Sequence, residues 1–91
     1  MLLGFDPAKS ARNVRERNLP FELAAKLEWA QAVVYEDERF DYGETRMIAL
    51  APLRGRLHVV CYCERGEVRW IISFRKANRR EVRAYARAFG R

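Results

Sequence analysis

The 91-residue sequence lacks any apolar run near the ~20 residues that a membrane-spanning helix needs. Its short apolar start, Met1 to Phe5, meets an acidic side chain at Asp6 before a signal-peptide core can form. We therefore expect a cytoplasmic protein with no membrane segment. A chain of this length has room for one modest core, so we expect a single domain over residues 1–91.

Cysteine and histidine are also scarce: the chain has two cysteines, Cys61 and Cys63, and one histidine, His58. Residues two apart in a strand point to the same face, but two thiolates cannot complete a tetrahedral zinc shell. We expect reduced thiols, no metal site and no cofactor. The sequence has neither a glycine-rich phosphate loop nor a Ser-His-Asp spacing, which disfavours hydrolases that use those devices.

Negative charge is scarce in the second half of the chain. Residues 52–91 hold 11 of the 18 Lys and Arg but 3 of the 12 Asp and Glu, a balance of 11 − 3 = +8; residues 1–51 have 7 − 9 = −2. A basic half suits a phosphate-rich partner, whereas an acidic stretch such as residues 36–38 suits a basic one. A solvated surface remains the alternative to both.

The N-terminal third shows one strand signal and two helix signals. Asp6 can cap a helix, and Pro7 fits its first turn, so a helix with Ala11 and Val14 facing inward is predicted. The expected elements are a strand at 2–5, a helix at 7–17, and a second helix that starts at 19–21 and ends near 29. The two helices should form a hairpin.

Strand-like residues dominate from residue 32 onward. Short turns at 52–55 and 65–66 imply antiparallel neighbours. Asn78 and Glu81 form a capping-box signal for a last helix. We expect strands at 32–35, 45–51, 56–64 and 67–75, a charged loop at 36–41, and a final helix with an inward stripe of Val82, Tyr85, Ala86 and Phe89. The predicted fold class is therefore α+β: a strand, a two-helix hairpin, a four-stranded antiparallel meander and a C-terminal helix packed on the sheet.

Alternation along the last two strands predicts one apolar and one polar sheet face. The predicted apolar sets are Val68, Trp70, Ile72 and Phe74 in one strand, and Leu57, Val59, Cys61 and Cys63 in the other. The predicted polar face carries His58, Tyr62, Arg69, Ser73 and Arg75, and Glu44 and Arg46 can join it from the preceding strand.

Such a polar face suits cleavage of RNA by the RNA's own 2′-hydroxyl, a reaction that needs a base, cations and a proton donor but no metal. The arginine fork grips phosphate but almost never loses a proton. The expected catalytic residues are therefore Glu44 or His58 as the base and Arg69, Arg75 and Arg79 as the phosphate clamp. The expected substrate-binding residues are Arg46, Tyr62, Ser73, Lys76 and Arg83, with Tyr62 also able to donate a proton.

Several of these residues also have structural interpretations. A lone strand histidine such as His58 is more often structural than catalytic. Glu44 and Arg46 can simply pair with each other. The doublet Arg75-Lys76 is less easily explained, because cations beside a helix N-terminus are unfavourable to the helix dipole and indicate a nearby anion.

Several motifs together resemble the BrnT toxin family. They are Phe5-Asp6-Pro7-Ala8-Lys9 with Asn13, Phe21-Glu22, Arg39-Phe40-Asp41-Tyr42-Gly43-Glu44 with Arg46, and Glu64-Arg65-Gly66 with Arg69. The match continues through Ile71-Ile72-Ser73, Arg75-Lys76-Ala77-Asn78-Arg79-Arg80-Glu81 and Tyr85. The resemblance covers nearly the whole chain. One segment departs from it: the family commonly has Lys-His-Gly where this sequence has Glu16-Arg17-Asn18.

The resemblance implies a RelE-like fold, cleavage of RNA that inhibits translation, and neutralisation by a BrnA-like antitoxin with a ribbon-helix-helix domain. Because such domains are dimers, it also implies two toxins per antitoxin dimer. A nucleic-acid-binding module that acts by occupancy is the alternative from the basic charge. The departure at Arg17 keeps a third hypothesis open, an inactive relic kept as an interaction partner.

Overall fold

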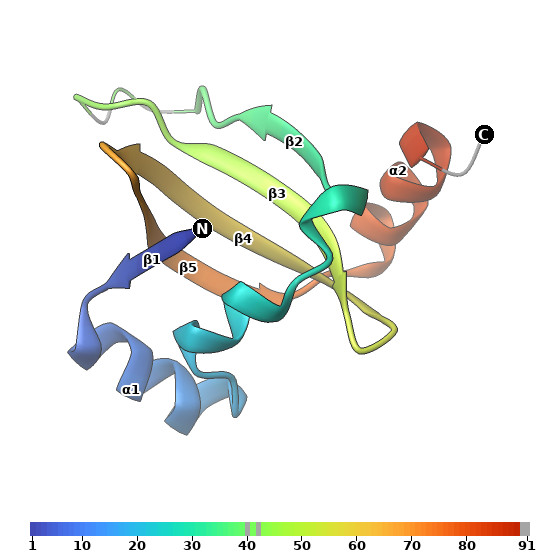
Figure 1. Ribbon diagram of the computed structural model, residues 1–91. Coiled ribbons are helices and arrows are strands. Elements are labelled where there is room, and N and C mark those ends of the chain that lie inside the picture. The colour runs from blue at the N-terminus through green and yellow to red at the C-terminus, as the bar shows by residue number, and fades with distance from the viewer. Residues whose placement is uncertain (40, 42, 90–91) are drawn as a thin grey trace.

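A computed structural model describes residues 1–39, 41 and 43–89 of the chain. The described residues form one five-stranded sheet in the order β1-β5-β4-β3-β2 (Figure 1). Its strands are β1 (Leu2–Phe5), β2 (Val33–Glu36), β3 (Met47–Leu53), β4 (Arg56–Arg65) and β5 (Val68–Lys76). Two α-helices, α1 (Pro7–Arg17) and α2 (Arg79–Phe89), and two 3-10 segments, η1 (Phe21–Lys26) and η2 (Trp29–Gln31), complete the elements. None of the described helices is long and apolar enough to cross a membrane.

The α+β class is confirmed, and the four strands β2 to β5 pair antiparallel as expected. The sheet is nevertheless mixed, because β1 adds a fifth strand parallel to β5. Gly4 lies beside Trp70 in this pairing, and a Cβ at Gly4 would stand 2.7 Å from Cε3 of the indole. The parallel edge therefore depends on the small size of glycine.

The prediction of a second α-helix that ends near residue 29 is wrong, because this segment forms the 3-10 helices η1 and η2 instead. A 3-10 helix has three residues per turn, so residues three apart share one side. Phe21, Ala24 and Leu27 have this spacing and are 2%, 0% and 5% exposed. Their spacing matches the tighter helix, which turns all three toward the sheet.

Helix α1 contacts the molecule through polar side chains, not through Ala11 and Val14 as expected; both of those are exposed. Asn13 is buried and donates from Nδ2 to the carbonyls of Leu19 at 2.8 Å and Phe74 at 2.9 Å. Ser10 is buried too, and its Oγ accepts a hydrogen bond from the backbone N–H of Phe21. These bonds compensate the burial of the two polar groups.

A β-bulge reverses the alternation of β5. Cys61 pairs with Ser73, but Tyr62 pairs with Ile71, so Ile72 has no single partner in β4. One extra residue in a strand moves every later side chain to the other face. The prediction that Arg69 and Arg75 share one sheet face is therefore wrong.

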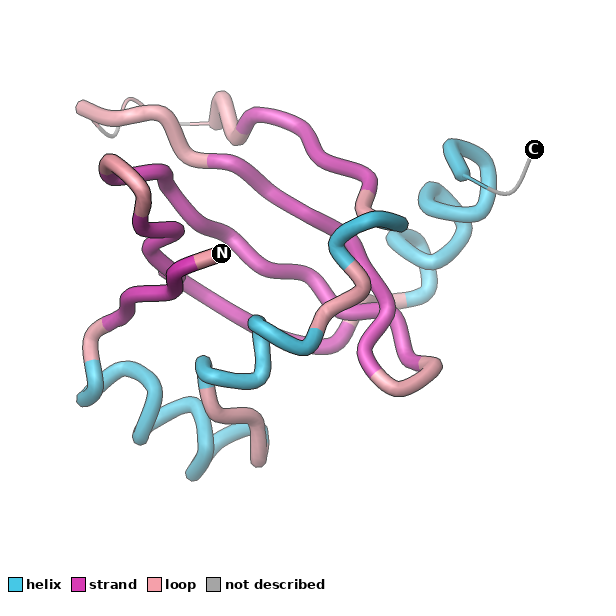
Figure 2. Tube along the Cα trace, viewed as in Figure 1, coloured by secondary structure: helices cyan, strands magenta, loops and turns pink. Residues whose placement is uncertain are grey.

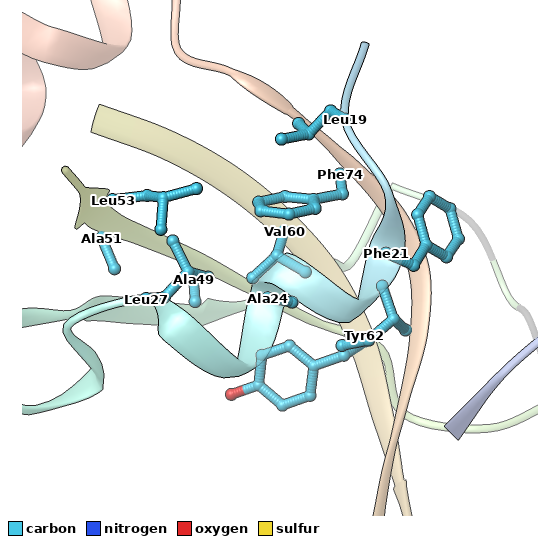
Figure 3. Packing of buried hydrophobic residues seen from close by; sticks show 11 residues of the cluster. Leu19, Phe21, Ala24, Leu27, Ala49, Ala51, Leu53, Val60, Tyr62 and Phe74 are labelled. Atoms are coloured by element: carbon cyan, nitrogen blue, oxygen red, sulfur yellow. The ribbon is translucent and has the colours of Figure 1, made fainter. Parts of the chain in front are cut away.

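The main core lies between η1 and the sheet (Figure 3). Phe74 and Val60 point toward Ala24 and Leu27 there, with Tyr62 at the side. All five are buried. The face of β4 that was expected to be polar, the side of His58 and Tyr62, is thus the covered face. The opposite side, which we name the open face, carries Cys61, Ser73 and Arg75.

Helix α2 lies beside β2 and away from α1 (Figure 1). It has no buried residue, so the expected packing of its apolar stripe on the sheet is largely wrong. Tyr85 alone joins a small cluster with Leu50, Val59 and Ala77, and its hydroxyl donates to the carbonyl of Gln31 at 2.7 Å. Val82 and Phe89 remain 40% and 47% exposed.

Candidate functional site

A hollow of about 330 Å³ lies on the open face, between the segment after β2 and the start of α2. Its floor follows from the register, because Cα partners across antiparallel strands point to the same side. Tyr35 pairs with Ile48, Ile48 with Cys61, and Cys61 with Ser73. We call this hollow the open-face hollow. Its lining residues are Tyr35, Glu36, Asp37, Glu38, Arg39, Ile48, Cys61, Ser73, Arg75 and Glu81.

Arg75 is held at the edge of this hollow by a carboxylate from α2. Its Nη1 and Nη2 donate to the two oxygens of Glu81 at 2.9 and 2.8 Å. The hydrogen bond from Arg75 is the main reason that the pKa of Glu81 lies below its ordinary value. Glu81 is the anion that the Arg75-Lys76 doublet predicted, although it comes from the protein itself.

Glu81 has a second role as half of the capping box. Its Oε1 accepts from the backbone N–H of Asn78 at 2.9 Å, and its own N–H donates to Oδ1 of Asn78 at 2.8 Å. The predicted helix start is therefore confirmed. The same carboxylate begins α2 and orients Arg75, so the position of the helix and the direction of this guanidinium are linked.

A second arginine at the hollow is positioned in the same way. Arg39 donates from Nε and Nη2 to the carboxylate of Asp37 at 2.8 and 2.9 Å. The Asp37 side chain is only 1% exposed, whereas that of Arg39 is 69% exposed. The pair therefore consists of a buried carboxylate, which fixes its position, and an exposed guanidinium.

Glu44 and Arg46 belong to the connection that leads from β2 into β3. This connection and the two strands lie along one edge of the sheet (Figure 2). Glu44 borders a neighbouring hollow of about 590 Å³ that shares residues 36–39 with the first. It pairs with Arg65 at 3.2 Å, and this hydrogen bond is the largest cause of its lowered pKa. Arg46 accepts at its carbonyl from the N–H of Asp37, which ties the loop to β3.

His58 is misplaced by the sequence prediction. It is 4% exposed on the covered face, against the ring of Phe74 at 5.6 Å between centroids. Its Nδ1 lies 2.7 Å from the carbonyl of Arg56, and burial lowers its pKa. His58 therefore has the structural role that a lone strand histidine more often has, and it is not part of the open-face hollow.

Arg69 and Tyr62 also lie on the covered face, so the bulge separates them from Arg75. Tyr62 is 3% exposed, and burial raises its pKa. The Arg69 guanidinium stacks 4.5 Å from the Tyr62 ring and 4.6 Å from the Trp29 ring, and it pairs with Glu64 at 2.6 Å. This cluster joins η2 to the sheet by cation–π contacts.

The other expected site residues lie around α2. Arg79 and Arg83 border a third hollow of about 510 Å³, which shares no lining residue with the open-face hollow. Lys76 is exposed at the end of β5. The structure therefore brings Ser73 and Arg75 together, places Glu44 and Arg46 nearby, and separates them from His58, Arg69 and Arg79.

Comparison with known proteins identifies the family of this chain. Residues 5–81 match the family described as "Ribonuclease toxin, BrnT, of type II toxin-antitoxin system". The chain belongs to the BrnT family. A search of curated proteins found no matching relative. The resemblance of the sequence to BrnT toxins is confirmed, and the match includes every residue that lines the open-face hollow.

Of the ten residues that line the open-face hollow, sequence reasoning assigned only Ser73 and Arg75 to the site. The eight that it missed include Tyr35, Asp37, Arg39 and Glu81. A signal for Arg39 was present, since Arg39 begins one of the BrnT-like motifs, whereas Asp37 was considered only as part of the acidic stretch at residues 36–38. The signal for Glu81 was also present but was read only as a helix cap. Tyr35 had no distinguishing signal beyond a β-rich run.

Within residues 1–39, 41 and 43–89, no group of three or more His, Cys, Asp or Glu side chains is placed to hold a metal ion. The two cysteines are free thiols, and burial raises the pKa of each.

Proposed function

We propose that this BrnT-family chain is a metal-independent endoribonuclease whose cleavage centre is the open-face hollow. The observation that supports this most is Arg75, whose guanidinium is fixed by Glu81 while its side chain stays 39% exposed beside Ser73. A cation oriented before the substrate arrives stabilises developing charge without reorganisation in the transition state. The ribonuclease activity of the family supports RNA as the substrate.

The proposed reaction uses the RNA's own 2′-hydroxyl. The 2′-oxygen attacks the adjacent phosphorus and the bond from phosphorus to the 5′-oxygen breaks, leaving a 2′,3′-cyclic phosphate and a free 5′-hydroxyl. Arg75 and Arg39 hold the non-bridging oxygens. Glu44, from the neighbouring hollow that shares residues 36–39 with this one, takes the proton of the 2′-hydroxyl. Tyr35 donates a proton to the leaving 5′-oxygen in place of the buried Tyr62.

We further propose that cleavage inhibits translation in the cytoplasm until a BrnA-like ribbon-helix-helix antitoxin covers the toxin. The type II toxin-antitoxin family supports an antitoxin partner. Because ribbon-helix-helix domains dimerise, one antitoxin dimer would carry two toxins. Light scattering on the co-expressed pair measures this ratio, and one toxin per dimer would contradict it.

Incubation of the purified chain with RNA in excess chelator tests the cleavage itself. We expect new RNA ends in spite of the chelator, because the proposed reaction uses arginines where other nucleases use metal. These ends should carry 2′,3′-cyclic phosphates, because the attacking group is the 2′-oxygen. An Arg75→Ala preparation, purified in parallel, controls for contaminating nucleases. Intact RNA after incubation with folded wild-type protein would refute the proposal. Binding without cleavage would favour the occupancy-only alternative, which the basic half of the chain supports.

The same assay across pH distinguishes Glu44 from His58 as the base. The Arg65 hydrogen bond lowers the Glu44 pKa below 4.5, so Glu44 stays ionised as the pH falls. We expect a constant single-turnover rate from about pH 8 to about pH 5, followed by a fall as Glu44 protonates. The pKa of His58 is lowered from 6.5. A rate that already declines well above the pH range in which Glu44 protonates would assign the base to His58 instead.

The segment that departs from the BrnT pattern ends α1. Asn18 has a φ of 56°, a left-handed conformation that glycine adopts most easily and asparagine tolerates. Arg17, at the usual histidine position, borders a small hollow that also touches Ser73. This placement favours an active toxin in which Arg17 supports substrate binding over an inactive relic.

A further inference from the structure

The end of the molecule around α2 carries unneutralised positive charge. Among the described residues, no carboxylate forms a salt bridge with any arginine of this region. The arginines are Arg56, Arg79, Arg80, Arg83 and Arg87, and all are exposed. This region therefore differs from the open-face hollow, where Arg39 and Arg75 each have a carboxylate partner.

Three of these arginines meet at one concave place. The hollow of about 510 Å³ is lined by Arg56, Ala77, Asn78, Arg79, Val82 and Arg83, and we call it the arginine hollow. No carboxylate is among its lining residues. Arg56 comes from the start of β4 and donates from Nη2 to the carbonyl of Ala77 at 3.2 Å. Two separate elements thus supply guanidinium groups to the same hollow.

The backbone N–H groups of Asn78 and Glu81 at the start of α2 are not available to bind an anion in the arginine hollow. The capping box already joins the backbone N–H of Glu81 to Asn78 and the N–H of Asn78 to Glu81. An anion in the arginine hollow would therefore be held by side-chain guanidinium groups. Three clustered guanidinium groups with no carboxylate suit phosphate oxygens, which they grip by paired hydrogen bonds.

We infer that the arginine hollow is a second RNA-backbone site, which holds a phosphate of the same strand outside the cleavage centre. This inference rests on the proposed function for the identity of the polyanion. The two hollows share no lining residue, but Arg75, Lys76 and Ala77 connect them along the chain. An RNA strand that lies in the open-face hollow would follow this connection, past exposed Lys76, to the arginine hollow that Arg83 lines. The site anchors RNA and takes no part in the bond cleavage.

An acidic segment of a protein partner is the competing occupant of this surface. The lining of the arginine hollow favours RNA, because Val82 is its one large apolar side chain and protein interfaces are built around an apolar centre. A nucleic-acid backbone needs regular positive charge and no apolar contact.

Fluorescence anisotropy with a non-cleavable 2′-O-methyl RNA tests the site. For an RNA of roughly 20 nucleotides, the double variant Arg56→Gln/Arg83→Gln should bind about tenfold more weakly than wild type, and its log–log salt slope should shrink by about 1.4, the loss of two single-strand phosphate contacts. The matched control, Arg15→Gln/Lys26→Gln, removes the same charge from exposed positions on α1 and η1. It should keep wild-type affinity within about twofold.

Equal losses in both double variants would overturn the site, because only net charge would matter. Unchanged RNA binding together with lost retention of the co-expressed antitoxin would assign the surface to a protein partner and also overturn it. Wild-type protein that does not cleave RNA but binds it through Arg56 and Arg83 would refute the proposed cleavage and support this site.

Discussion

Replacing Arg75 by alanine should abolish RNA cleavage and growth inhibition while the protein remains folded. Removing one preorganised donor from a developing anion typically lowers the rate by about 10²–10³-fold, and Glu81 holds the guanidinium of Arg75 in place through two hydrogen bonds. Its side chain is 39% exposed, so the substitution should cost little stability, typically within ~0.5 kcal/mol plus the loss of a partly solvated ion pair. Single-turnover cleavage and thermal unfolding measure the two effects.

Three further variants identify the cause of the loss. Arg75→Lys keeps the charge but not the fork, and we expect it to remain at least tenfold impaired. Glu81→Gln keeps the size of the side chain but weakens the clamp, so it should lower cleavage less than Arg75→Ala does. Arg15→Ala, an exposed arginine on α1, should behave as wild type. A melting temperature far below that of wild type for Arg75→Ala would make Arg75 a structural residue instead.

The elements of the fold were predictable where the periodicity of apolar residues agrees with the capping and turn residues at the ends of each element. The strand at 2–5, the helix start at Asp6, the antiparallel strands and the capping box of the last helix were all expected from local signals. The parallel pairing of β1 was not predicted. It depends on the contact between Gly4 and Trp70, residues far apart in the sequence, and neither residue carries a local signal of that contact.

The candidate site was less predictable, because one unpaired residue changes the faces of a strand. Without the bulge at Ile72, Arg69 and Arg75 would project from the same side of β5, as simple alternation expects. Alternation also gave the wrong burial on β4, since Tyr62 and His58 are polar enough to look exposed but are covered by η2 and Phe74. Burial of such residues depends on partners from other elements, and no local pattern records them.

Replacing Phe74 by alanine should unfold most of the protein, whereas replacing Trp70 should not. Alternation assigns both side chains to the core, but the bulge between them puts them on opposite faces. Phe74 is 1% exposed and packs in the main cluster with Val60 and Ala24. Truncating a buried phenylalanine costs about 3–5 kcal/mol, a large part of the roughly 5–15 kcal/mol that stabilises a domain.

Trp70 provides the control because it is the larger side chain but is only partly buried. Its ring lies against Gly4 and under the Arg65 guanidinium, 4.8 Å away, outside the main cluster. Trp70→Ala removes that exposed contact and loosens the β1 edge, so we expect a loss of about 1–2 kcal/mol, below the cost of a fully buried aromatic. Urea denaturation gives both free energies of unfolding. If Trp70→Ala unfolds the protein and Phe74→Ala leaves it folded, the side of the sheet that carries the core is opposite to the one described, and the open-face hollow is lost with it.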